Sequence, residues 1–236
     1  GVSSAASDVY KRQLLIMLSS YSVCRAMVMP ASFLVVLFYA IYLVVRNGVI
    51  SYQKASGLAM FSGIVIFCFY SFIRLKEMLP VEEYGYDAIF FILLILCFAW
   101  GGDTCAYFAG RAFGKHKLCP VVSPKKTVEG AVGGVLGTMV FGVLVTVIYS
   151  VAADRMEAFT RSNIGVSMYI IIALLACVAA VLGIYGDLFA SVVKRQCGIK
   201  DYGTIFPGHG GILDRFDSVM FIAPFVTMVV IAVFYH

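Results

Sequence analysis

Charged residues are scarce in this chain. Only 13% of its 236 residues are charged, whereas an ordinary soluble domain has roughly 25%. Hydrophobic residues make up 61% of the sequence, and the mean hydropathy is +0.95. This composition excludes an ordinary soluble domain and indicates an integral membrane protein.

Several common site motifs are also missing. The seven cysteines are scattered and form no Cys-x-x-Cys pair, so we predict neither a zinc site nor a disulfide framework. The stretch Gly110-x-x-x-Gly114-Lys115-His116 has the wrong spacing for a P-loop and lacks the Ser or Thr that would follow. The net charge of +5 is modest, and its basic residues gather in particular loops. We therefore expect anionic ligands and no nucleic acid as partners.

Long apolar runs are what the chain has in abundance. They do not alternate with polar residues, so helices are the spanning elements we expect. The predicted fold is all-α, a polytopic transmembrane helical bundle of about six to seven spans with a polar site on the cytoplasmic side. The third span is expected to be interrupted at Gly101-Gly102-Asp103. The expected spans are 27–45, 57–73, 88–107, 128–153, 165–190 and 218–235.

The chain divides into three expected sections. Residues 1–13 are polar and end abruptly at an apolar run, and we expect them to be a non-native leader. Residues 14–98 are expected to be N-terminal transmembrane helices, truncated at their start. Residues 99–236 are expected to be a catalytic membrane domain.

Lysine and arginine counts orient the expected spans. If loop 107–127 is cytoplasmic, loops 46–56 and 191–216 are cytoplasmic as well, and the three hold 11 Lys and Arg. The opposite loops, 74–87 and 151–165, hold four. The positive-inside rule therefore predicts a multi-pass protein of the cell (inner) membrane, with both charged central loops and the active site facing the cytoplasm.

Carboxylates occur at or near membrane depth at Asp103, at Asp187 and at the pair Asp214 and Asp217. A lone carboxylate in hydrocarbon is costly, so each needs a cation, a metal or a watery cavity. An interhelical ion pair or hydrogen bond is the simpler structural explanation. Beside basic residues, such carboxylates also suit Mg²⁺ that holds phosphate oxygens.

Polar residues recur at helical spacing in two places. Intervals of three and four residues put the members of each set on one face of a helix. We expect both faces to reach the same polar site. The first set is Asp187, Ser191, Lys194 and Arg195, and the second is Asp103, Tyr107, Gly110 and Arg111.

A second basic stretch precedes the span 128–153. Ser123 followed by Pro124 predicts a helix N-cap and first helical position, which puts Lys125 and Lys126 in the first turn. The helix dipole disfavours cations there, so an anion bound at the helix start would explain the placement. Alternatively, these lysines only enforce cytoplasmic orientation. Glycines 130, 133, 134 and 137 in the same span have GxxxG spacing, which indicates close helix packing.

Two ordered motifs carry a family resemblance over residues 99–225. The first is Asp103-Thr104-x-Ala106-Tyr107-x-x-Gly110-Arg111-x-Phe113-Gly114-Lys115 followed by Ser123-Pro124-Lys125-Lys126-Thr127-x-Glu129-Gly130. The second is Ser191-x-x-Lys194-Arg195, Lys200-Asp201 and Pro207-Gly208-His209-Gly210-Gly211-x-x-Asp214-Arg215-x-Asp217. Together they resemble the signature of the phosphatidate cytidylyltransferase (CDP-diacylglycerol synthase) family. Many bacterial members of that family carry Glu where this chain has Ala190.

The resemblance implies a Mg²⁺-dependent nucleotidyltransferase of phospholipid biosynthesis that transfers CMP from CTP to phosphatidic acid, forming CDP-diacylglycerol and pyrophosphate. By similarity, the metal-associated residues are Asp187, Asp214 and Asp217. The implied catalytic residues are Asp187, Lys194, Arg195, Asp214, Arg215 and Asp217. The implied substrate-binding residues are Asp103, Tyr107, Arg111, Ser123, Lys125, Lys126, Ser191, Lys200, Asp201, His209, Gly210 and Gly211.

Other interpretations stay open at this point. His209 could be a general base, a phosphate donor or a structural residue, because phosphate attacking phosphate needs no strong base. A CTP-dependent kinase of a polyprenol-type lipid alcohol would also use a metal and a basic pocket. An ion-coupled transporter could keep carboxylates inside helices. Expected partners are CTP, phosphatidic acid and membrane lipids, and we count a second copy of the chain, as a homodimer, among the candidates.

Overall fold

The computed structural model describes residues 33–34, 37–38, 40–41, 44–45, 52–155, 165–203 and 211–234. The expected leader 1–13 and most of the expected span 27–45 lie outside the described residues, as do His209 and Gly210. The chain divides into two compact units, residues 1–61 and 62–236. Both polar motifs belong to the second unit.

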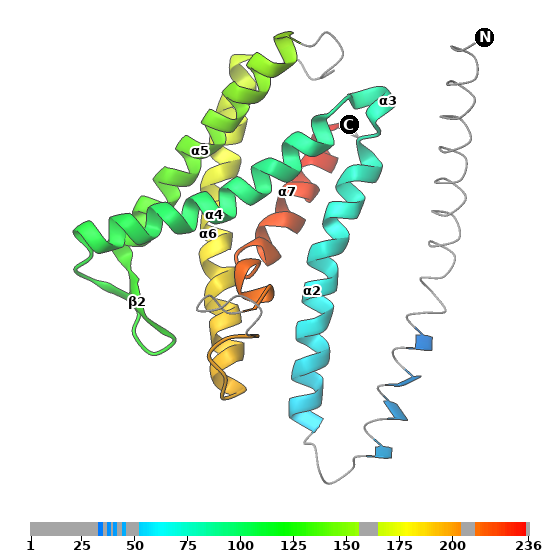
Figure 1. Cartoon of the computed structure of the whole chain (residues 1–236), viewed down its shortest axis with the longest axis vertical. Coiled ribbons are helices and arrows are strands. Elements are labelled where there is room, and N and C mark those ends of the chain that lie inside the picture. The colour runs from blue at the N-terminus through cyan, green and yellow to red at the C-terminus, as the bar shows by residue number, and fades with distance from the viewer. Residues whose placement is uncertain are drawn as a thin grey trace. The chain divides into compact units, whose positions relative to one another are not determined.

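Helices dominate the described chain (Figure 1). Four of the described helices are long and apolar enough to cross a membrane, over 59–78, 87–113, 128–152 and 166–196, and a shorter apolar helix covers 219–232. This confirms the predicted class, a helical membrane protein. The elements are α2 (Tyr52–Met78), α3 (Val81–Tyr84), α4 (Asp87–Phe113), β1 (Lys117–Cys119), β2 (Ser123–Thr127), α5 (Val128–Arg155), α6 (Val166–Gln196), the 3₁₀ helix η1 (Leu213–Arg215) and α7 (Val219–Phe234).

Helix α4 is central to the packing. It contacts α5 along much of its length and also touches α6 and α7, while α5 packs on α6 and α6 on α7. In Figure 1, α4 crosses in front of the yellow helix α6. Phe98 of α4, Ile172 of α6 and Ile222 of α7 are almost fully buried in the resulting core. Burial of large side chains such as these supplies the close packing that holds membrane helices together.

Small residues let α4 and α5 approach closely. A methyl group added to Gly133 would overlap Ala109, and one added to Gly134 would lie 3.0 Å from the Cβ of Ala106. This confirms the close packing predicted from the glycine spacing. The predicted interruption of the third span is wrong, because α4 runs unbroken to Phe113. Its Gly102 instead leaves room for Thr138 of α5.

The predicted helix start at Ser123 is also wrong. Residues 123–127 form β2, which pairs antiparallel with β1, Cys119 opposite Ser123, so the all-α prediction misses a small hairpin. Helix α5 begins at Val128, where the Thr127 hydroxyl accepts a hydrogen bond from the Gly130 N–H at 3.1 Å, as an N-cap does. The first-turn position predicted for Lys125 and Lys126 is wrong for the same reason. Both lie in the strand before the helix.

Candidate active site

A lysine from the hairpin reaches a carboxylate on α6. The Nζ of Lys126 forms an ion pair with Asp187, and both side chains are about a quarter exposed. The Ser191 hydroxyl donates to Oδ1 of Asp187 at 3.4 Å, as expected for residues one helical turn apart. The two basic and acidic segments identified from the sequence therefore meet in space.

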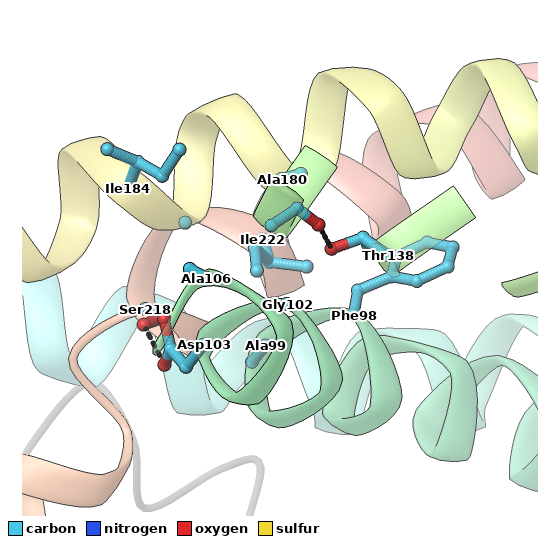
Figure 2. A pocket seen from close by; sticks show the side chains of 12 residues that line it. Phe98, Ala99, Gly102, Asp103, Ala106, Thr138, Ala180, Ile184, Ser218 and Ile222 are labelled. Atoms are coloured by element: carbon cyan, nitrogen blue, oxygen red, sulfur yellow. Dashed lines mark hydrogen bonds between the residues drawn. The ribbon is translucent and has the colours of Figure 1, made fainter. Parts of the chain in front are cut away.

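Ser218 joins the Asp103 carboxylate of α4 to Asp217. Its hydroxyl donates to Oδ2 of Asp103 at 2.9 Å, and its backbone N–H donates to Oδ1 of Asp217 at 2.9 Å. Figure 2 shows Asp103 and Ser218 pointing toward each other at one end of a small cavity. Ser218 was not among the predicted site residues, and its main signal in the sequence is a hydroxyl directly after the acidic motif. We call Asp103, Asp187 and Asp217 the acidic cluster.

The Asp217 carboxyl is buried near the other two carboxyl groups of this cluster. Burial raises the pKa of the Asp217 carboxyl to about 7, and repulsion from Asp187 and Asp103 adds to the effect. The Nζ of Lys194 lies 4.0 Å from its Oδ2 and offsets only part of that repulsion. A cation at the acidic cluster would relieve the remainder.

Asp214 lies in a very different environment from Asp217. Its Oδ1 accepts a hydrogen bond from Nζ of Lys194 at 2.9 Å. Its Oδ2 accepts from the backbone N–H groups of Tyr202 and Gly211, both at 2.8 Å. Burial raises the pKa of Asp214, but the hydrogen bonds from Lys194 and the two N–H groups outweigh it and hold the pKa below its ordinary value. Asp214 is therefore a stable carboxylate with protein donors on both oxygens.

A pocket of about 340 Å³ opens beside Asp187. Basic groups from α4 and β2 and apolar groups from β1, α5 and α6 all line it, a mixture that suits a ligand with both an anionic and an apolar portion. The predicted helical face of α4 does line one wall. The lining residues include Asp103, Tyr107, Gly110, Arg111, Leu118, Lys125, Lys126, Ala131, Ile184 and Asp187.

A second cavity of about 20 Å³ also has Asp103 in its lining. It is large enough for one water molecule. Phe98, Thr138 and Ile222 line it together with Ser218 (Figure 2). Asp103 therefore borders both the large pocket and a small, mostly apolar space between α4, α5, α6 and α7.

The remaining predicted site residues are more dispersed. Arg195 and Arg215 are exposed at the surface, and the backbone carbonyl of Arg215 accepts a hydrogen bond from Nε1 of Trp100 at 3.0 Å. Lys200 and Asp201 are exposed just beyond α6. Ser123 lies in β2 and is not among the residues that line the pocket.

Glu129 organises the hairpin and was not predicted as a site residue. Its carboxylate accepts hydrogen bonds from the backbone N–H groups of Lys115 and His116, at 3.0 and 3.2 Å. It also contacts Nδ1 of His116 at 2.6 Å. These bonds tie the exit of α4 to the first turn of α5, which fixes the two ends of the hairpin that carries Lys125 and Lys126.

The donor set fits a hard divalent cation in part. Among the described residues, no three His, Cys, Asp or Glu side chains gather as a ready-made metal cage. Mg²⁺ commonly takes only one or two carboxylates and completes its shell with water and phosphate oxygens. Asp217 and Asp187 are carboxylates whose mutual repulsion a cation would relieve, so they fit such a site.

The helical membrane fold, with an acidic cluster beside a basic and partly apolar pocket, defines a membrane protein with a site suited to phosphate-bearing ligands. The cytidylyltransferase family model matches residues 4–233. The chain belongs to this family.

Similar proteins carry a more specific name. A protein named phosphatidate cytidylyltransferase from Bacillus subtilis (strain 168) is 34% identical over 198 residues, 84% of this chain and 66% of the relative. One from Staphylococcus saprophyticus is 41% identical over 147 residues, 62% of this chain and 51% of the relative. One from Staphylococcus haemolyticus is 39% identical over 145 residues, 61% of this chain and 50% of the relative. The chain thus spans between half and two thirds of the length of these relatives.

Proposed function

We propose that this protein transfers CMP from CTP to phosphatidic acid, forming CDP-diacylglycerol and pyrophosphate in phospholipid biosynthesis. The observation that carries the proposal is the pocket itself. Arg111, Lys125 and Lys126 line it together with Leu118 and Ile184, and Asp103 and Asp187 of the acidic cluster line it as well. The name of the similar proteins supports the same activity.

The pocket suits a lipid phosphate. Its apolar residues include Ala131 of α5 and Ile184 of α6, two helices long and apolar enough to cross a membrane, so an acyl chain could remain in the bilayer while the phosphate meets the basic residues. Arg111, Lys125 and Lys126 would bind that phosphate and orient one of its oxygens toward the α-phosphorus of CTP. The new bond forms at that phosphorus while its bond to the β-phosphate oxygen breaks, and pyrophosphate leaves.

The acidic cluster would hold Mg²⁺. Asp187 and Asp217 would be its protein ligands, and Asp103 would stay beside them through Ser218. When bound, Mg²⁺ would neutralise charge on the phosphate oxygens during transfer. Lys126, which pairs with Asp187, also lines the pocket and would be placed to bind a phosphate oxygen of the substrate.

We also propose that the site faces the cytoplasm of a multi-pass protein in the cell (inner) membrane. The exit of α4, the hairpin, the start of α5 and the end of α6 all meet at one end of the helices. That end carries most of the lysine and arginine residues counted from the sequence. CTP would reach the pocket from this side, and phosphatidic acid from the adjoining leaflet.

An assay of both products tests the proposal. Purified protein in detergent micelles would receive Mg²⁺, phosphatidic acid and CTP labelled in the cytidine, and we expect label in lipid together with an equal amount of pyrophosphate. Asp217→Asn should abolish both products. Glu82→Gln, an exposed carboxylate on α3 outside the pocket, is the matched control and should form both. Absence of both products, under conditions in which the Bacillus subtilis relative forms CDP-diacylglycerol, would overturn the proposal. Release of CDP without lipid label would indicate a kinase instead.

A further inference from the structure

We infer that Asp214 is a positioning residue that fixes the backbone before Asp217, and that it is not a ligand of the cation. This inference rests on the proposed function only in assuming that a divalent cation binds the acidic cluster. It differs from the assignment that the resemblance implies, in which Asp214 and Asp217 are both metal-associated. The two carboxylates are three residues apart in sequence but have different partners.

Both carboxylate oxygens of Asp214 accept hydrogen bonds from the protein. A carboxylate offers about four lone-pair positions, and three described donors occupy Asp214: Lys194 on one oxygen, Tyr202 N–H and Gly211 N–H on the other. The one position left is on Oδ1, beside the Lys194 ammonium, whose positive charge repels a metal cation at that oxygen. Asp217 has a single described backbone donor, the N–H of Ser218.

The same bonds hold the backbone near Asp214 in place. The N–H groups of Tyr202 and Gly211 both donate to Oδ2 of Asp214, so these two parts of the chain lie close together. Gly203 and Gly211 touch closely enough that a methyl group on Gly211 would lie 2.9 Å from the Gly203 nitrogen. We call Tyr202, Gly203, Gly211 and Asp214 the neck.

Lys194 and Tyr202 attach the neck to α6. Lys194 is buried between Asp214 and Asp217, and its Nζ lies 5.2 Å from the centre of the Tyr202 ring, within range of a cation–π interaction. The Tyr202 hydroxyl donates to the Ala190 carbonyl of α6 at 3.0 Å. Asp214, Lys194 and Tyr202 therefore form one connected unit on the last turns of α6.

The residues between Asp214 and Asp217 are also attached to α4 and α2. Trp100 of α4 donates from Nε1 to the carbonyl of Arg215 at 3.0 Å. The Phe216 ring packs against Trp100 and against Phe69 of α2, with centroids 6.1 and 5.7 Å apart. The residues that lead to Asp217 are thus held from α6 through Asp214 and from α4 through Trp100. Their rigidity places the Asp217 carboxylate beside Asp187 and Asp103.

A double-mutant cycle of Asp214 with Lys194 tests the inference. Mn²⁺ alone would be the probe, its affinity measured by electron paramagnetic resonance without CTP or lipid. We expect Asp214→Asn to weaken Mn²⁺ binding about tenfold in the wild-type background, as loss of a supporting residue does. In the Lys194→Met background, where the ion pair is already gone, the same substitution should change the affinity less than about threefold, because coupled residues do not act additively. An equal loss in both backgrounds would identify Asp214 as a metal ligand and overturn the inference.

Amide hydrogen exchange gives a second readout that does not depend on the metal. Asp214→Asn should speed exchange at Tyr202 and Gly211 by about tenfold or more, since local opening then costs less free energy. Asp217→Asn, the matched control, should leave exchange at these two amides unchanged while it abolishes Mn²⁺ binding. Unchanged exchange in Asp214→Asn would overturn the inference. If wild-type protein binds no Mn²⁺, the proposed cation fails, and the exchange data still decide the role of Asp214.

Discussion

Two lysines pair with aspartates at this site, and they lie in contrasting surroundings. Lys126 and Asp187 form an open pair in the lining of the large pocket, with side chains about a quarter exposed. Lys194 and Asp214 form a buried pair, with 11% and 8% of their side chains exposed. Two backbone N–H groups also bind Asp214. The same two residue types can therefore serve different purposes, because burial and extra hydrogen bonds decide whether a pair can exchange its partners.

The energetic consequences of the two pairs differ accordingly. A partly exposed ion pair contributes little to stability, because water competes for both charges. Breaking a buried pair leaves an uncompensated charge in a poor solvent. We therefore assign the open pair to ligand exchange and the buried pair to structure.

The largest expected effect is on the buried pair. Lys194→Ala should lower the free energy of unfolding by about 3 kcal/mol, because Asp214 is left buried without its cation. Urea unfolding in detergent, followed by Trp100 fluorescence, would measure the change. Arg195→Ala, an exposed neighbour on the same helix, is the matched control and should shift stability by less than about 0.5 kcal/mol. Equal effects of the two substitutions would remove the distinction between the pairs.

The next effect concerns the open pair. Asp187→Asn should lower the rate of CDP-diacylglycerol formation about 100-fold, equivalent to about 2.7 kcal/mol of transition-state stabilisation. The same substitution should change the free energy of unfolding by less than about 1 kcal/mol. Parallel activity and unfolding measurements would check both. A large loss of stability would mean that Asp187 is structural as well.

A smaller effect tests how the open pair is held in place. Thr127→Ala removes the hydroxyl that caps α5, so the free energy of unfolding should fall by about 1 kcal/mol. Ser123→Ala is the matched control, since Ser123 lies in β2 and caps no helix, and it should have almost no effect. The reverse result would restore the helix start predicted at Ser123.

The smallest expected effect is the influence of ionic strength on the contribution of each pair to stability. Raising ionic strength to about 1 M shortens the screening length to about 3 Å, so the small stability difference between wild type and Lys126→Ala should shrink toward zero. The difference between wild type and Lys194→Ala should persist, because buried charges are screened much less. Unfolding curves at low and high salt would show both. Equal salt dependence would contradict the contrast in burial.

The apolar helices were largely predictable from the sequence, but their ends were less so. The span expected over 128–153 matches α5, which covers Val128–Arg155. The span expected over 165–190 ends six residues before α6 does. Hydropathy shows where the apolar residues of a helix end. The helix itself continues beyond Ala190 because no Gly or Pro follows before Gln196. Lys194 and Arg195 belong to its last turn, where positive charge complements the helix dipole.

The site was predictable in composition and less so in arrangement. Helical spacing correctly put the α4 set on one wall of the pocket. The different environments of Asp214 and Asp217 depend on donors from Tyr202, Gly211 and Lys194, which no local pattern links to either residue. The helix start predicted at Ser123 was wrong for a similar reason. Ser123 and Pro124 have the local chemistry of a helix start, but pairing with β1 places them in a strand.

Helix α4 makes the site sensitive to the thickness of the bilayer. At 27 residues it is about 40 Å long, which exceeds a hydrocarbon core of about 30 Å, so it tilts or projects beyond that core. It is a single unbroken helix that carries both Asp103 and Arg111 and packs closely on α5. A change in lipid chain length that alters the tilt of α4 would therefore move this wall of the pocket together with the residues around Asp217, which α4 holds through Trp100 and Ser218.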